Sequence, residues 1–169
     1  MQRRRLQHHS SPSSAFTLIE LVIVMAILAV VGSIALPRYA NSVSIHRVDA
    51  TARRIAADLS FTQRRARIGS STLKISFDPA HAKYTISNAA GNSVGYNLRA
   101  AEEAGASGVV DLSVDPYVAT ILSADFGDDS VIVFDGFGLP DSGGSVVVQV
   151  ANHKKTIAVD AQTGKPAVN

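Results

Sequence analysis

The spacing of apolar and polar residues changes along the chain, and each segment predicts a different kind of element. Residues 1–15 are basic and polar, which predicts an unpacked lead-in. From Phe16 to Leu36 nearly every residue is apolar, and Glu20 is the single charged residue. As an α-helix these residues extend about 31 Å, close to the thickness of a bilayer's hydrocarbon core. The pattern therefore predicts a helix long enough to cross a membrane.

A second helical pattern follows Pro37. Apolar and small side chains recur at three- and four-residue spacing, which predicts an amphipathic helix to about residue 68. Its expected inner face consists of Ile45, Val48, Ala52, Ile55, Leu59, Thr62 and Ala66. Gly69 follows and is placed to end the helix in a left-handed conformation. Together the two patterns predict one helix from about Phe16 to Ile68, with a bend near Pro37.

From Thr72 onward the apolar period is two, which predicts β-strands separated by turns. The least regular stretch is 89–108, where we expect a loop with a short helix at 98–104. The fold class is therefore α+β, with antiparallel sheets packed on the polar half of the helix. The expected strands lie near 72–78, 83–87, 108–114, 117–123, 130–135, 145–151 and 155–160.

Composition narrows the class of protein. The 169 residues are enough for one ordinary domain, and 46% hydrophobic against 18% charged residues argues against a disordered chain. There is no cysteine, so no disulfide and no thiol nucleophile can be proposed. The five histidines include no pair at i, i+4, and no nucleophile-elbow or phosphate-cradling motif occurs. We therefore expect no enzyme activity, no cofactor and no metal site.

One acidic cluster is a candidate calcium site. Asp125, Asp128, Asp129 and Asp135 supply the oxygen ligands that calcium prefers. A solvated loop is the favoured interpretation of these residues.

The N-terminal segment has two interpretations. In the first it is an ordinary signal peptide with basic residues at 3–5, an apolar core at 21–31 and a small-residue cleavage site at 33–35. Glu20 argues against this, because a carboxylate at the membrane centre costs roughly 2.5–3.5 kcal/mol. In the second, cleavage between Ala15 and Phe16 creates an amine that the Glu20 of a neighbouring subunit neutralises. Such pairing in a low dielectric would set the axial register of a helical bundle.

The residues Ala15-Phe16-Thr17-Leu18-Ile19-Glu20-Leu21-Val22 resemble the class III signal of type IV pilins and type II secretion pseudopilins. The resemblance implies that a prepilin peptidase cuts before Phe16 and methylates the new amine. It also implies that Glu20 serves assembly and that Pro37 stands where many pilins carry a kinking proline. The residue before the cut is usually glycine in that family, and here it is Ala15.

The C-terminal region 131–168 carries a second resemblance, to the GspH/FimT type of pilin domain. The residues that fit its pattern of a strand, a glycine turn, a hairpin and a terminal Thr-Gly-Lys segment are Phe134, Gly138, Gly143, Gly144, Thr163 and Gly164. The two resemblances imply a pilin-like fold with three parts. These are a cleaved prepilin leader at 1–15, a transmembrane and assembly helix at 16–37, and a periplasmic domain at 38–169.

The function implied by these resemblances is that of a minor pseudopilin of a type II secretion system, and not an enzyme. The protein would cross the bacterial inner membrane once and join other pseudopilins through its N-terminal helix. Its further partners would be the prepilin peptidase and methyltransferase and the inner-membrane assembly platform. The first alternative is a minor type IV pilin in pilus priming or DNA uptake. The second is an exported β-domain with an ordinary signal peptide.

Nucleic acid is not an expected partner. Arg64, Arg65 and Arg67, with Lys154 and Lys155, could contact phosphates, as in some FimT-like pilins. However, Arg3, Arg4 and Arg5 are three of 16 basic residues against 14 acidic ones, so a chain beginning at Phe16 is nearly neutral. No aromatic residues are interleaved with the basic ones to stack on bases. The favoured interpretation is a solvated helix face or a contact with neighbouring subunits.

Overall fold

The computed structural model describes residues 16–94 and 108–169, and at Pro37 it describes only the backbone. The leader at 1–15, including Ala15, and the helix expected at 98–104 lie outside the described residues. The chain divides into two compact units, residues 1–40 and 41–169, which are described separately. Helix α1 (Leu18–Gly69) contributes to both, and it confirms the single long helix that the sequence predicts. The bend expected near Pro37 stays a prediction.

The C-terminal end of α1 differs from the sequence prediction by one residue. Gly69 is still helical, and Ser70 takes the left-handed conformation, with φ of 44°. The Ser71 N–H donates to the Ala66 carbonyl at 3.1 Å, and the Ser70 N–H donates to that of Arg67 at 3.3 Å. These two bonds form a Schellman motif, which needs its left-handed residue directly after the last helical one. The prediction that Gly69 is left-handed was therefore wrong.

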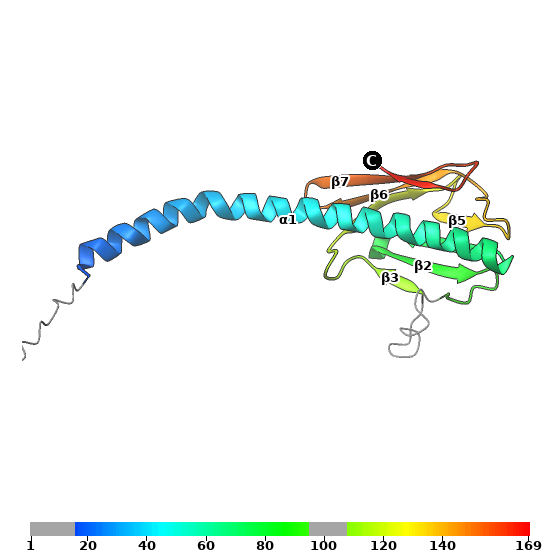
Figure 1. Ribbon diagram of the computed structural model, residues 1–169, viewed down its shortest axis with the longest axis horizontal. Helices are drawn as coiled ribbons and strands as arrows, with labels where there is room; N and C mark the ends of the chain where they lie inside the picture. The colour runs from blue at the N-terminus through cyan, green and yellow to red at the C-terminus, as the bar shows by residue number, and fades with distance from the viewer. Residues whose placement is uncertain (1–15, 95–107) are drawn as a thin grey trace, which may run out of the picture. The chain divides into compact units, whose positions relative to one another are not determined.

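Two four-stranded antiparallel sheets make up the rest of the second unit (Figure 1). The first has the order β3-β2-β1-β5 and the second the order β4-β6-β7-β8, which confirms the α+β class. The strands of the first sheet are β1 (Leu73–Asp78), β2 (Lys83–Asn88), β3 (Val109–Asp111) and β5 (Val131–Phe134). Those of the second are β4 (Thr120–Asp125), β6 (Gly144–Val150), β7 (His153–Val159) and β8 (Pro166–Val168). A 3-10 turn, η1 (Pro79–His81), joins β1 to β2.

The hydrophobic core lies between α1 and the two sheets. The alternate residues of the strands that point inward are fully buried, among them Ile75, Ile132 and Val148. The expected inner face of the helix is buried from Val48 to Ala66. Ile45 was predicted to lie on this face, but it is 43% exposed. It lies one turn before Val48, the first residue of this face that is buried, so its side chain is only partly covered.

Seven strands were predicted, and the structure has each of them with shifted ends. The strand expected at 108–114 ends at Asp111, whose carboxylate accepts a hydrogen bond from the Ser113 N–H at 2.9 Å and starts a turn. The strand expected at 117–123 begins only at Thr120, after a loop in which Pro116 has no N–H for a ladder. Strand β8 was not predicted, because its three residues begin with a proline and show no alternation.

Candidate functional site

No large apolar side chain in the first part of α1 is buried in the described chain. Every large apolar side chain from Leu18 to Leu36 is at least 44% exposed. By length and composition this helix can cross a membrane, a test that a signal sequence near an N-terminus also passes. Inside it, the Ser33 hydroxyl donates to the Val30 carbonyl at 2.7 Å, so its polar atom is satisfied within the helix. A helix with no polar face needs lipid or other apolar helices around it.

Thr17 and Glu20 start this helix. The Glu20 N–H donates to the Thr17 Oγ1 at 3.2 Å, and the Leu21 N–H donates to the Thr17 carbonyl at 3.2 Å. Thr17 is thus the N-cap, and Glu20 occupies the third helical position, the spacing of a capping box. A carboxylate in the first turn is also favoured by the positive end of the helix dipole. This capping role of Thr17 and Glu20 was not predicted, although the Thr-x-x-Glu spacing signals it.

The Glu20 carboxylate is exposed and has no hydrogen bond or ion pair with any residue that the structure describes. Phe16, on the other side of Thr17, is 78% exposed. The backbone of Glu20 is therefore held by its own helix, while its charge remains available to a group outside the described chain. A cationic group on a neighbouring helix fits this position, because an unpaired carboxylate in lipid is costly.

A second polar cluster is buried in the domain. Asp58 of α1 is fully buried, and its Oδ2 accepts hydrogen bonds from the Tyr84 hydroxyl at 2.5 Å and the Arg54 Nε at 3.0 Å. The Asp58 Oδ1 has no hydrogen-bond partner among the described residues. Burial, followed by the charge of Asp58, raises the pKa of the Tyr84 phenol above its ordinary value. This cluster joins α1 to β2, so its role is to fix the helix on the first sheet.

Three of the residues that carry the second resemblance, Gly138, Thr163 and Gly164, converge on Gln63 of α1. The Gln63 side-chain amide donates to the carbonyls of Gly138 at 2.9 Å and Thr163 at 2.6 Å. Gly164 has φ of 66°, and a Cβ there would lie 2.7 Å from the Gln63 Nε2. Gly138 has φ of 76° and faces the Gln63 carbonyl. These residues therefore hold the C-terminal turns on the helix, which is a structural role.

The arginines near the end of the helix make hydrogen bonds or a ring contact within their own chain. The Arg67 Nε donates to the Phe137 carbonyl at 3.0 Å, and the Arg64 Nε donates to a carbonyl one turn earlier at 3.2 Å. Arg65 lies over the Phe61 ring at 5.9 Å. These contacts explain the arginines without a ligand. The expectation that nucleic acid is not bound stays a prediction.

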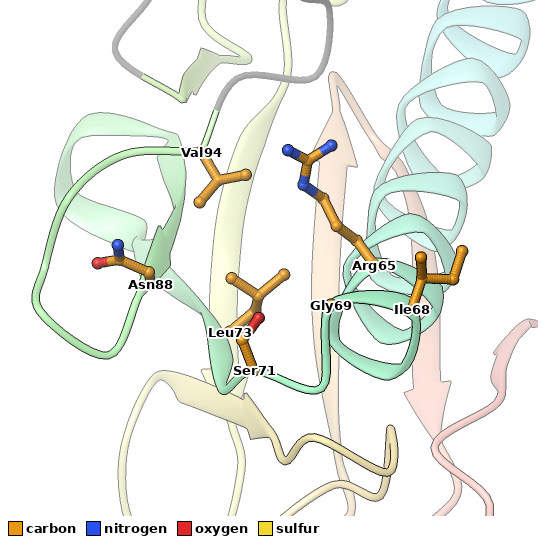
Figure 2. A pocket seen from close by; sticks show the side chains of 7 residues that line it. All are labelled: Arg65, Ile68, Gly69, Ser71, Leu73, Asn88 and Val94. Atoms are coloured by element: carbon orange, nitrogen blue, oxygen red, sulfur yellow. The ribbon is translucent and has the colours of Figure 1, made fainter.

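A hollow of about 470 Å³ lies at the C-terminal end of α1. Figure 2 shows Arg65 of the helix opposite Asn88 and Val94. Its remaining described lining is Ile68, Gly69, Ser71 and Leu73. This set holds one cation and no carboxylate, imidazole or thiol. The lining therefore offers no acid–base or nucleophilic pair.

Two of the four aspartates of the candidate calcium site accept hydrogen bonds from backbone N–H groups in turns. Asp129 accepts a hydrogen bond from the Val131 N–H at 2.9 Å. Asp135 accepts from the N–H groups of Phe137 at 2.9 Å and Leu139 at 2.8 Å. Within residues 16–94 and 108–169, no three acidic or histidine side chains are grouped so as to hold a metal ion.

Comparison with known proteins bears on the N-terminal segment. Residues 10–36 match the family model described as the prokaryotic N-terminal methylation motif. No curated protein and no solved structure matches the chain. The matched residues include the segment around Ala15 and Phe16, the capped start of α1, Glu20 and the exposed apolar helix. Proteins with this motif are structural subunits that a prepilin peptidase processes and that assemble with other pilins. At its N-terminus this chain therefore carries a type IV pilin-like methylation motif.

Proposed function

We propose that the protein is a minor pseudopilin of a type II secretion system, a structural subunit of the periplasmic pseudopilus. The observation that carries the proposal is the Glu20 carboxylate, which has no partner among the described residues and lies in a helical segment whose large apolar residues from Leu18 to Leu36 are all exposed. The methylation motif over residues 10–36 supports it. The first part of α1 would cross the bacterial inner membrane once, and the domain after it would lie in the periplasm.

The assembly step follows from the chemistry of the N-terminus. Prepilin peptidase would cut between Ala15 and Phe16, and the new Phe16 amine would be methylated and positively charged. Within one chain this amine reaches Glu20 only awkwardly. The Glu20 of an adjacent subunit can meet it directly, and a slip of one turn would leave both charges unpaired in lipid. The pairing would fix the register in which the assembly platform adds each subunit.

The order of elements in the C-terminal region supports a domain of the GspH/FimT type. Strand β5, the turn around Gly138, the β6–β7 hairpin and the segment at Thr163 follow one another in the chain order of that type. Gln63 binds the two turns to α1, so the pattern in the sequence corresponds to one packed unit. In the pseudopilus this unit would present its surface to other minor pseudopilins, the secretin or cargo.

Deleting the gene in its host is expected to stop export of type II substrates into the medium while pili and DNA uptake persist. The measurement is the extracellular activity of secreted enzymes, with twitching motility and transformation assayed in the same strains. Complementation with the unaltered gene must restore export. Normal export together with lost piliation or lost transformation would contradict the pseudopilin role and favour a minor type IV pilin.

A further inference from the structure

The β6–β7 turn lies at the end of the second unit where that unit's part of α1 begins, near Asn41 (Figure 1). The His153 Nε2 is hydrogen-bonded to the Asn41 Oδ1 at 2.7 Å, which ties the first residue of β7 to α1. At the other end of these strands, Gly144 pairs with Val159 beside the Thr163 turn, which is bound to Gln63. The β6–β7 turn is therefore held at the level of Asn41 in the second unit.

Asn41 is close to the end of the apolar stretch along the chain. It follows Leu36 by five residues, all within α1. Five helical residues rise about 7.5 Å, and five residues span at most about 18 Å even when fully extended. The headgroup layer adds roughly 5–8 Å to each side of a bilayer's hydrocarbon core. If Leu36 ends the membrane span, the helical rise places Asn41 at the outer edge of the headgroup layer, and the β6–β7 turn is held beside Asn41.

Two lysines of β7 follow this turn. Lys154 is exposed and Lys155 is half-buried, and neither ammonium forms an ion pair or hydrogen bond with a described residue. They sit opposite Gln149 and Val148 of β6, which carry no charge to neutralise them. The carboxylates of Asp115 and Asp111 are already paired within the domain, with Arg47 at 3.0 Å and with Lys83 at 3.2 Å. The turn is thus a net positive point at the level where phosphate groups of lipids would lie.

We propose that Lys154 and Lys155 dock the domain on the anionic phospholipid headgroups of the leaflet from which α1 emerges. The inference rests on the membrane anchoring in the proposed function. Lysines held at an anionic membrane surface are attracted to it, and salt screens the attraction. Before assembly the domain would rest on the membrane through this turn. Entry into a filament would require these lysines to leave the lipid headgroups. Attraction to anionic headgroups would therefore oppose the assembly of the subunit.

The chain has no cysteine, so single cysteines can carry fluorescent labels on the full-length protein. Asn152→Cys, in the turn, reports docking, and Gln162→Cys, in the turn after β7, is its matched control. Ile27→Cys, within the apolar helix, reports insertion. Each labelled protein is reconstituted in vesicles of phosphatidylcholine alone or mixed with phosphatidylglycerol. Nitroxide lipids with the spin label on the headgroup or on the acyl chain then act as quenchers.

Headgroup quenching of the Asn152 label is expected to be about twofold stronger in the anionic vesicles and to fall in high salt. Lys154→Gln with Lys155→Gln should abolish the difference, and Lys74→Gln, which removes a charge from β1, should leave it unchanged. The Gln162 label should show no dependence on lipid charge. Equal quenching of the Asn152 label in both vesicles, with the Ile27 label quenched by acyl-chain nitroxides, would overturn the docking alone. An Ile27 label that is not quenched would overturn the anchoring and the docking together.

Discussion

Replacing Glu20 with glutamine is expected to leave the protein in the membrane and to reduce its incorporation into the filament at least about tenfold. The variant keeps the size and shape of the side chain but leaves the methylated Phe16 amine of the adjacent subunit without a counter-charge. Removing one partner of a buried ion pair costs about 3–5 kcal/mol, more than enough for this loss. Incorporation is measured as the amount that co-purifies with a tagged partner pseudopilin, relative to the amount in the membrane fraction.

Thr17→Ala is the matched control for this prediction. It removes the Thr17 Oγ1 that accepts from the Glu20 N–H, and so weakens the helix start by about 0.5–2 kcal/mol without changing any charge. If charge pairing controls assembly, Thr17→Ala should incorporate far better than Glu20→Gln. Incorporation of Glu20→Gln at the level of the unaltered protein would refute the pairing.

Asp58→Ala is expected to destabilise the domain by about 3–5 kcal/mol, because it removes the carboxylate that accepts from the partly buried Arg54 guanidinium and from the buried Tyr84 hydroxyl. The measurement is urea unfolding of the full chain in detergent, followed by a signal from the domain. The triple variant Arg54→Met, Asp58→Leu and Tyr84→Phe should recover most of the loss, because apolar side chains of similar volume can replace a buried ion pair. A loss below about 1 kcal/mol for Asp58→Ala would show that the cluster does not hold α1 on the sheet.

Alkaline pH tests the same cluster through Tyr84. Burial and the nearby Asp58 raise the pKa of the Tyr84 phenol in the folded state above its ordinary value of about 10. Its contribution to stability is therefore fully present below pH of about 10 and is lost as the pH rises further, because the unfolded chain then releases the proton first. Tyr84→Phe should flatten the unfolding free energy above that pH. An equally steep fall in this variant would assign the alkaline sensitivity to other groups.

Local periodicity was sufficient to predict the long helix and the alternating strands. The repeat from Val48 to Ala66 follows the helical period, and strand β1 alternates buried and partly buried side chains as its sequence alternates apolar and polar residues. The three residues of strand β8 show no alternation of apolar and polar residues. They form a strand because they pair with β7. Ser70 was missed as the left-handed residue because a neighbouring glycine has the higher intrinsic preference for that conformation.

The polar clusters differ in how far the sequence could reveal them. The Thr17 cap is local, and its spacing to Glu20 was available in the sequence. Asp58 and Tyr84 are 26 residues apart, and Gln63 and Thr163 are 100 apart, so only the tertiary fold brings them together. In the sequence, Asp58 looked like one more polar residue of an amphipathic helix. The glycines at 138 and 164 were noted as part of a pattern, but their shared partner on α1 was not predictable.

The mass of the mature N-terminal peptide, measured on protein from the membrane fraction, distinguishes prepilin processing from an ordinary signal peptide. We expect a peptide that begins at Phe16 and carries one methyl group on its amine. We also expect an unprocessed precursor when Ala15 is replaced by arginine, because the proposed cut requires a small side chain before it. A mature chain that begins at Leu36 and is found outside the membrane would contradict the account, because Glu20 and its helix would then have been discarded.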